Sequence, residues 1–316
     1  MQRARALAEG HWRSPFAATR SHATAQPLAP VPEPTATPPP VTLGWVVAEP
    51  CPDDDQGPRL AEGWQLVCGA SPEQTCLLSA AEAEQLLGQD KPLILLVGDG
   101  HRSVPFSYAK GYPAVARHAA RRQVHLYVEF SEAGWAAHCA KRAGSALPPW
   151  LVAAGAEVVA WEPPVCEYVM VLVEHAFALS CAYPLPPAVA QRRSALLALT
   201  KVCAEAFSEY VPALAQRLHS TVSALLVPEH DAAQAALTAL LTILTVSWRD
   251  EYINPYLAER VARHAARCPN DLFLVSVGGA HLVCSYGPVQ QHLARLRQEE
   301  GAFNHALLFH EGQSLR

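Results

Sequence analysis

The sequence lacks several motifs from which a function is usually assigned. Its cysteines number nine, an odd count, and no two of them form a Cys-x-x-Cys pair. A zinc ribbon and a complete disulfide framework are therefore both disfavoured, and we expect reduced thiols. The Walker A sequence and the Gly-x-Ser-x-Gly nucleophile elbow are also missing. Their absence argues against a P-loop enzyme and a standard α/β-hydrolase.

Positive charge and long apolar runs are scarce as well. Lys and Arg number 24 against 29 Asp and Glu, a net charge of −5, so the basic footprint of a nucleic-acid-binding protein is missing. No uncharged apolar stretch reaches the roughly 18–20 residues of a membrane span. The N-terminus has no apolar region of a cleavable secretory signal. We expect no nucleic-acid partner and no membrane span, and favour a cytoplasmic location. Organelle transit and non-classical export stay open, because residues 1–30 carry four arginines and one glutamate.

The chain is organised as a tail followed by one large domain. Half of the 316 residues are hydrophobic, which is enough for a sizeable core. Residues 1–42 are rich in Ala, Thr and Pro, and we expect a disordered tail because they cannot bury enough apolar surface to offset the entropy of ordering. Residues 43–316 are expected to form an α/β domain. Within it, residues 165–247 show helical periodicity interrupted by prolines, which predicts a helical cap or insertion.

Strands and helices alternate in the first part of this domain. Strands are expected at 91–98, 124–130 and 156–161, with helices over 114–122 and 132–142 between them. This order predicts a mostly parallel sheet flanked by helices. The sheet is expected to resume at residues 272–277 and to end with the apolar run 306–309.

Two histidines follow strands in the same way. His101 comes after Gly98-Asp99-Gly100, and His281 comes after Gly278-Gly279-Ala280. The carboxyl edge of an open parallel sheet is where α/β proteins build their sites, and glycine lets the backbone approach a ligand closely. The repeated ending therefore predicts one cleft that both histidines share.

Glu129 ends the strand that follows the His101 strand in the sequence. If the two strands are neighbours, about 4.8 Å apart, the Glu129 carboxylate reaches the space above His101. His101, Glu129 and His281 could then ligate a divalent metal ion, or act as a base with an orienting carboxylate. Two alternatives remain open: Glu129 as a helix cap and His281 as a core histidine.

Arg249 lies in the sequence Trp248-Arg249-Asp250-Glu251, which is expected to open a helix. A guanidinium at that place can clamp an anionic substrate group or stabilise an oxyanion. A salt bridge on the helix surface is the alternative.

Taken in order, these motifs resemble a superfamily that comprises the erythromycin esterases, the ChaN-type haem-binding lipoproteins and the TraB/Tiki metalloproteases. The resemblance covers about residues 91–130 and 248–295, and Asp99 departs from the Thr or Glu found there in TraB or ChaN members. It implies that His101 and Glu129 form a reactive pair, with Arg249 and His281 across the cleft. The matching residues are Gly98, His101, Glu129, Arg249, Asp250, Gly278 and His281.

The expected function is hydrolysis of an ester or amide bond in a small-molecule or peptide substrate, with or without a divalent metal ion. His101 would be the general base or a metal ligand, Glu129 would orient or share that role, and His281 would assist. Arg249 would hold the substrate or the developing oxyanion. Two other classes stay open: a haem- or metal-binding protein without turnover, and a non-catalytic effector or interaction module.

Overall fold

The structure, a computed structural model, describes residues 64–68, 76–99, 115, 121–141, 147, 149–227, 229–278, 281–282 and 287–310. The predicted tail (residues 1–42), His101 and most of the helix expected over residues 114–122 lie outside these ranges.

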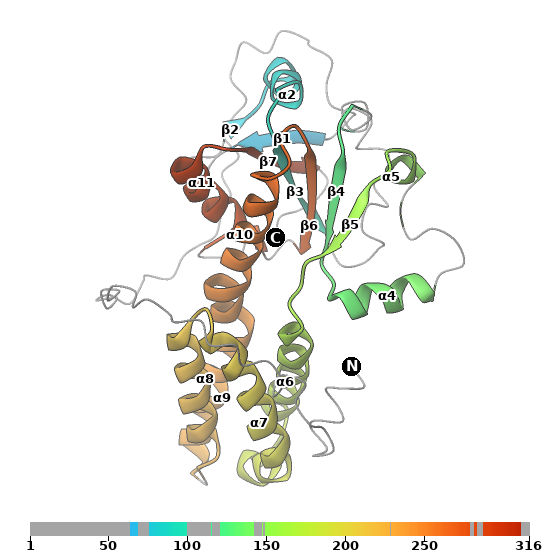
Figure 1. The fold of residues 1–316 in the computed structure, drawn as a ribbon. Helices are drawn as coiled ribbons and strands as arrows, with labels where there is room; N and C mark the ends of the chain where they lie inside the picture. Colours follow the sequence, from blue (N-terminus) through green and yellow to red (C-terminus); the bar gives the residue numbers. More distant parts are fainter. Residues whose placement is uncertain are drawn as a thin grey trace, which may run out of the picture.

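In this part of the chain seven strands form one sheet, in the order β2-β1-β7-β3-β6-β4-β5 (Figure 1). The last five of that order run parallel, and β1 and β2 add an antiparallel edge. The predicted α/β fold with a mostly parallel sheet is confirmed. The strands are β1 (Trp64–Cys68), β2 (Cys76–Leu77), β3 (Leu93–Asp99), β4 (Val124–Val128), β5 (Glu157–Ala160), β6 (Leu272–Gly278) and β7 (Asn304–His310).

The strand order corrects one expectation. β6 lies between β3 and β4 and pairs with both, so that Leu272 is in register with Leu93 on one side and Val124 on the other. Glu129, which follows β4, therefore neighbours the strand of His281 and not the strand that precedes His101. The sequence predicts that consecutive strands are neighbours, whereas a strand about 145 residues later lies between these two.

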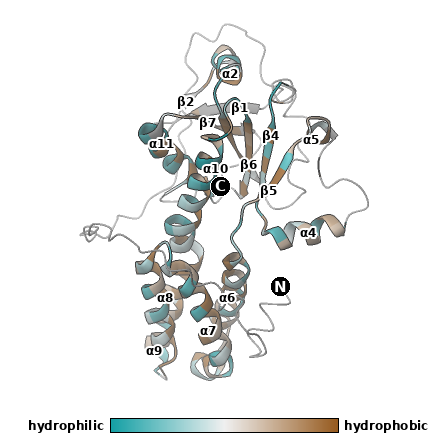
Figure 2. Ribbon diagram, in the orientation of Figure 1, coloured by the Kyte–Doolittle hydropathy of each residue, from teal (hydrophilic) through white to brown (hydrophobic). Residues whose placement is uncertain are grey.

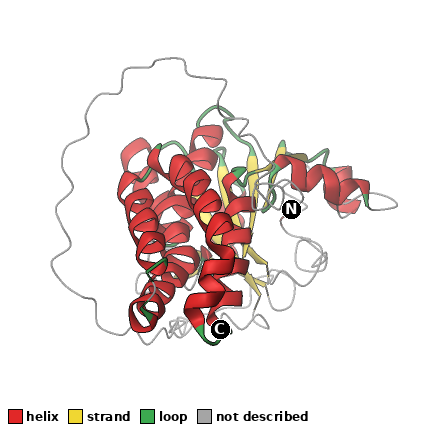
Figure 3. Ribbon diagram, turned by 90° about the horizontal axis from the view of Figure 1, so that it is seen from below, coloured by secondary structure: helices red, strands yellow, loops and turns green. Residues whose placement is uncertain are grey.

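Different helices cover the two faces of the sheet. Successive side chains of a strand point to opposite faces, so alternate residues of one strand contact different helices. On β3, Ile94 and Leu96 join the apolar cluster of the later helices, whereas Leu93, Leu95 and Val97 join that of the earlier ones. Figure 3 shows the strands with the larger group of helices on one side. The earlier helices are α2 (Ala80–Leu87), α4 (Glu132–Ala140) and α5 (Pro149–Ala153); the later ones run from α6 to α11.

A bundle of four helices extends from the carboxyl end of the sheet (Figure 1). Each helix carries hydrophobic and hydrophilic stretches (Figure 2). One apolar cluster runs from Phe273 and Val275 of β6 to Leu237 and Leu240 of the bundle, so sheet and bundle share a core. The bundle occupies the segment expected to be a helical insertion, and consists of α6 (Val165–Ser180), α7 (Leu185–Ser208), α8 (Pro212–Leu225) and α9 (His230–Thr242).

α9 continues without a break into α10 (Asn254–Ala265), forming a helix of 36 residues. Two π-helical turns, Ile243–Ser247 and Arg249–Ile253, join them. Pro255 has no N–H to donate and its ring crowds the preceding turn, and a widened turn accommodates such a proline. Arg249 thus lies inside a continuous helix, and the expectation that it opens one was wrong.

This same stretch, His230–Ala265, is the one helix of the described residues that is long and apolar enough to cross a membrane by length and composition. No such stretch was expected from the sequence. A single helix of this kind decides little, because the core helix of a soluble protein meets the same criterion. Here it carries the adjacent charges of Arg249 and Asp250.

Candidate active site at the carboxyl edge of the sheet

Glu129 and His281 meet where β4 and β6 end. Nε2 of His281 lies 3.5 Å from Oε1 of Glu129, and the two side chains are 11% and 19% exposed. The structure thus brings together two of the three groups expected in the cleft. The third, His101, lies outside the described residues, but it follows β3, the other neighbour of β6, whose Asp99 is in register with Gly278.

The backbone of β6 holds the Glu129 carboxylate in place. The N–H of Gly278 donates a short hydrogen bond to Oε2 of Glu129. This bond leaves Oε1 as the oxygen that faces His281. Glu129 is not the cap of the next helix, because the Ser131 side chain accepts a hydrogen bond from the N–H of Gly134 at 3.0 Å and caps α4.

Asn254 fixes the tautomer of His281. Its side chain is fully buried, and Nδ2 donates to the carbonyl of Gly287 at 2.8 Å. A carbonyl can only accept, so the amide must be oriented with Oδ1 toward Nδ1 of His281, 2.6 Å away. Oδ1 in turn can only accept, so the proton is on Nδ1 of His281. In the neutral ring the lone pair is then on Nε2, the nitrogen that faces Glu129.

With a neutral His281 ring, two acceptors face each other across 3.5 Å. Such a pair needs a proton, a water molecule that donates to both, or a cation between the two atoms. Two ligands of a tetrahedral zinc ion, each about 2.0–2.2 Å from the metal, lie roughly 3.4 Å apart. Glu129 and His281 thus fit two positions of a divalent metal site and equally fit a bound water.

Further carboxyl groups lie near Glu129. Burial, with a smaller contribution from the neighbouring Glu129 and Glu167 carboxylates, raises the pKa of Glu162 to about 7. Glu162 follows β5, and its N–H donates to the carbonyl of Phe130 at 3.0 Å, which ties it to the end of β4. A carboxyl group with a pKa near neutrality can exchange a proton at working pH, so Glu162 suits a general acid or base.

An aromatic side chain forms one wall beside His281. Trp161 is fully buried, and its ring lies edge-on to that of His281 with centroids 6.0 Å apart. Its Nε1–H donates to the carbonyl of Ser276 in β6 at 3.3 Å. The wall reduces access of bulk water to His281, which strengthens electrostatic interactions at its ring.

Arg249 forms an ion pair with its neighbour in the sequence. Its Nε lies 3.3 Å from Oδ1 of Asp250, and the two side chains are 13% and 9% exposed. A salt bridge, the alternative role for Arg249, is therefore present, although its partners are mostly buried and not on the helix surface. Arg249 is the first residue of the π-helical turn that ends directly before Asn254. Any role of Arg249 toward substrate stays a prediction.

No family model, curated protein or solved structure matches this chain. The sequence reasoning missed two residues of the site, Asn254 and Glu162. Asn254 precedes a proline, a pattern typical of a helix boundary. The pattern therefore gives no sign that Asn254 is a buried polar residue inside a continuous helix. Glu162 comes directly after the expected strand 156–161. A carboxylate at the end of a predicted strand is the same signal that identified Glu129, and it could have identified Glu162.

Proposed function

We propose that this protein hydrolyses an ester or amide bond, at a site formed by Glu129 and His281 with Asn254 behind them. The observation that carries the proposal is the 3.5 Å separation between Nε2 of His281 and Oε1 of Glu129, two acceptors held so by separate hydrogen bonds. A water molecule between them would donate one proton to each. Nε2 could then accept a proton from this water as it attacks a carbonyl carbon, while Glu129 orients it.

A divalent metal ion fits the same pair. His281 and Glu129 would supply two ligands, and the predicted third is His101. A bound metal would lower the pKa of a coordinated water. The resemblance to the esterase and TraB/Tiki superfamily adds support, because it assigns the reactive groups to His101, Glu129 and His281, and the last two lie side by side. The small-molecule or peptide nature of the substrate is part of the same proposal.

The test is hydrolysis of a panel of chromogenic esters and peptide amides by the full chain, with a chelator and with added Zn²⁺, Mn²⁺ or Mg²⁺. Glu129→Gln and His281→Asn should each lower kcat/KM by at least about 100-fold, the usual range for a general acid or base. The asparagine at 281 can still donate to Asn254 from the place of Nδ1 and lacks only the Nε2 position, so it separates chemistry from folding.

Matched controls are Glu132→Gln and His219→Gln, which change exposed residues of the same types. Both should keep full activity. Turnover that survives Glu129→Gln and His281→Asn would exclude this site. Tight binding of a metal ion or haem that both substitutions abolish, with no turnover on any substrate, would instead establish the alternative of a binding protein.

A further inference from the structure

A second group of metal-ligating side chains lies at the opposite, amino-terminal edge of the sheet. His125 is the second residue of β4, His264 is in the last turn of α10, and Cys268 follows that helix. One ligand atom from each lies within 4.8 Å of the others. Glu129 lies four positions after His125 along β4 and its end, about 13 Å away at the rise of a strand. The group is thus separate from the site at the carboxyl edge.

Asp271 contacts two members of this group. Its Oδ2 lies 2.8 Å from Nε2 of His125, and its side chain also hydrogen-bonds to the thiol of Cys268. The carboxylate therefore accepts from two residues that could themselves bind a metal. The Asp271 carboxylate thus lies beside both Nε2 of His125 and the thiol of Cys268. A cation there would replace the protons that now link these atoms.

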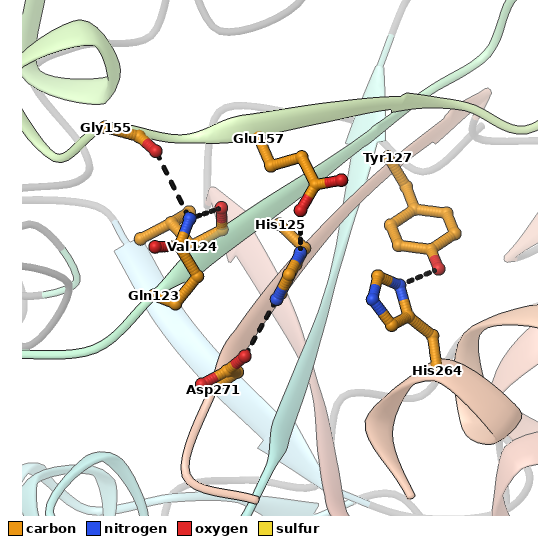
Figure 4. Close-up of polar contacts among 8 residues, drawn as sticks. All are labelled: Gln123, Val124, His125, Tyr127, Gly155, Glu157, His264 and Asp271. Carbon is orange, nitrogen blue, oxygen red and sulfur yellow. Dashed lines mark hydrogen bonds and ion pairs between the residues drawn. The ribbon is translucent and has the colours of Figure 1, made fainter. Parts of the chain in front are cut away.

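Each histidine has a polar partner on its other nitrogen. Tyr127 Oη lies 2.8 Å from Nδ1 of His264, and Glu157 Oε2 lies 3.1 Å from Nδ1 of His125 (Figure 4). The contact with Glu157 falls short of hydrogen-bond geometry, and Nδ1 of His125 is a buried polar atom without a hydrogen bond. Metal-binding histidines usually donate the N–H that does not face the metal to a carboxylate or another oxygen. If the proton of His125 were on Nδ1, that N–H could donate to the Glu157 carboxylate and leave Nε2 to bind the metal.

We propose that His125, His264, Cys268 and Asp271 bind a Zn²⁺ ion. Two imidazoles, one thiolate and one carboxylate form a ligand set of the kind that zinc takes in tetrahedral sites. The two negative ligands balance the charge of the ion. Zinc–nitrogen distances of about 2.0–2.1 Å and a zinc–sulfur distance of about 2.3 Å place tetrahedral ligand atoms roughly 3.4–3.6 Å apart. The ligand atoms of His125, His264 and Cys268, which lie within 4.8 Å of one another, must therefore approach, whereas Oδ2 of Asp271 must move away from Nε2 of His125, now 2.8 Å distant. Ring rotation of His264 and a shift of the Cys268 turn can supply that movement.

The site would join two segments that are far apart in the sequence. His125 belongs to the sheet, whereas His264 lies in the last turn of α10, and Cys268 and Asp271 lie between α10 and β6. Zinc would thus fix the end of the long helix to the amino edge of the central strands. Cys268 is partly exposed, which leaves an entry path for the ion. This role is independent of the proposed hydrolase site.

The test is titration of the reduced, chelator-treated full chain with Co²⁺, which occupies zinc sites and shows a near-ultraviolet charge-transfer band when a thiolate binds it. We expect one equivalent of Co²⁺ with this band, and displacement by Zn²⁺. Cys268→Ser should abolish the band, and His264→Gln should weaken Co²⁺ binding at least tenfold. Tyr127→Phe should weaken it by about tenfold and keep the band, because Tyr127 only orients His264.

Three controls should keep the band: Cys181→Ser, an exposed thiol; Cys284→Ser, three residues after His281; and Glu129→Gln, in the proposed hydrolase site. Loss of hydrolysis in the last with an intact band would separate the two sites. Where Cys268→Ser fails to fold, Zn²⁺ should slow alkylation of Cys268 in the unaltered chain at least tenfold and leave Cys181 unaffected. No band at millimolar Co²⁺, a band that persists in Cys268→Ser, or equal alkylation rates would overturn the proposal.

Discussion

Nδ1 of His281 lies 2.6 Å from Oδ1 of Asn254, and the carbonyl of Gly287 orients that amide from its other side. A buried amide on a helix thus decides which nitrogen of a histidine on the sheet edge faces Glu129. His281, which follows β6, supplies the nitrogen that faces Glu129, and Asn254 of the long helix orients the His281 ring.

Removal of this amide should affect both stability and the tautomer. Asn254→Ala leaves Nδ1 of His281 and the carbonyl of Gly287 without their partner, so we expect a loss of about 2–4 kcal/mol in the free energy of unfolding. Nitrogen NMR of the His281 ring should show a mixture of tautomers in the variant and one tautomer in the unaltered chain. Asn304→Ala is the matched control, since Asn304 is also buried but bonds to Gln89. It should lower stability without changing the His281 spectrum; equal spectra for all three proteins would contradict the assignment.

The raised pKa of Glu162 gives a stability effect of predictable sign. Its folded pKa, about 7, exceeds its ordinary value of 4.5, so folding favours the protonated group. The resulting stabilisation is complete below pH 4.5 and is lost as pH rises to about 7. Glu162→Gln, which stays neutral, should therefore be more stable than the unaltered chain at pH 8 by about 1–2 kcal/mol, and similar at pH 4.5. Denaturant unfolding in chelator measures this, with the exposed Glu174→Gln as control. A variant that is less stable at pH 8 would show that the carboxylate form is needed.

Arg249 should separate a structural role from a functional one. Arg249→Lys keeps a cation beside Asp250 and removes the planar fork, so we expect the free energy of unfolding to stay within about 1 kcal/mol. Activity or ligand affinity should fall at least tenfold, about 1.4 kcal/mol. Arg217→Lys is the control. Arg217, in α8, is half exposed and pairs with Glu251, which lies in the same long helix as Arg249. Lower stability with unchanged activity in Arg249→Lys would restrict Arg249 to its ion pair.

His305 should destabilise the fold in acid. Its ring is buried in β7, and neither ring nitrogen has a hydrogen bond. Burial, together with the nearby Arg297, lowers the pKa of His305 from 6.5 to about 4. The unfolded chain gains a proton as pH falls through 6.5, whereas the folded chain does so only near 4. Stability is therefore full above pH 6.5 and declines between 6.5 and 4, by up to about 3 kcal/mol. His305→Leu should remove this part of the pH dependence, whereas exposed His219→Gln should not. Equal pH slopes in His305→Leu and the unaltered chain would refute the effect.

The sequence predicted which segments form strands better than it predicted which strands lie side by side. The apolar run before Gly98 identified β3, and the run before Gly278 identified β6, because buried parallel strands are hydrophobic on both faces. Hydrophobicity does not encode which strand lies beside which, so the place of β6 could not be read from it. α7 begins at Leu185 and has two prolines in its first turn. The sequence predicts interruptions of the helical periodicity at the prolines, although the first turn of a helix tolerates proline.

The same limit applies to the site. Glu129 and His281 were found because each lies shortly after the end of a strand, and a parallel sheet brings such ends to one edge. Asn254 could not be found in this way, because its role depends on the direction in which a helix of 36 residues returns to the sheet. Only the tertiary structure brings Gly287, Asn254 and His281 into one chain of hydrogen bonds.

β6 lies between β3 and β4 in the sheet but comes long after both in the sequence, and this order affects how the chain folds during synthesis. β3 pairs with β6 and β7 alone among the described strands, so it leaves the ribosome about 170 residues before either partner exists. Loop closure over that distance is slow, and an unpaired hydrophobic strand is prone to aggregate. The nascent chain must keep β3 out of such contacts until residues 272–278 emerge. A product truncated before β6 would hold β3 with neither of its neighbours, so it should be insoluble or depend on a chaperone.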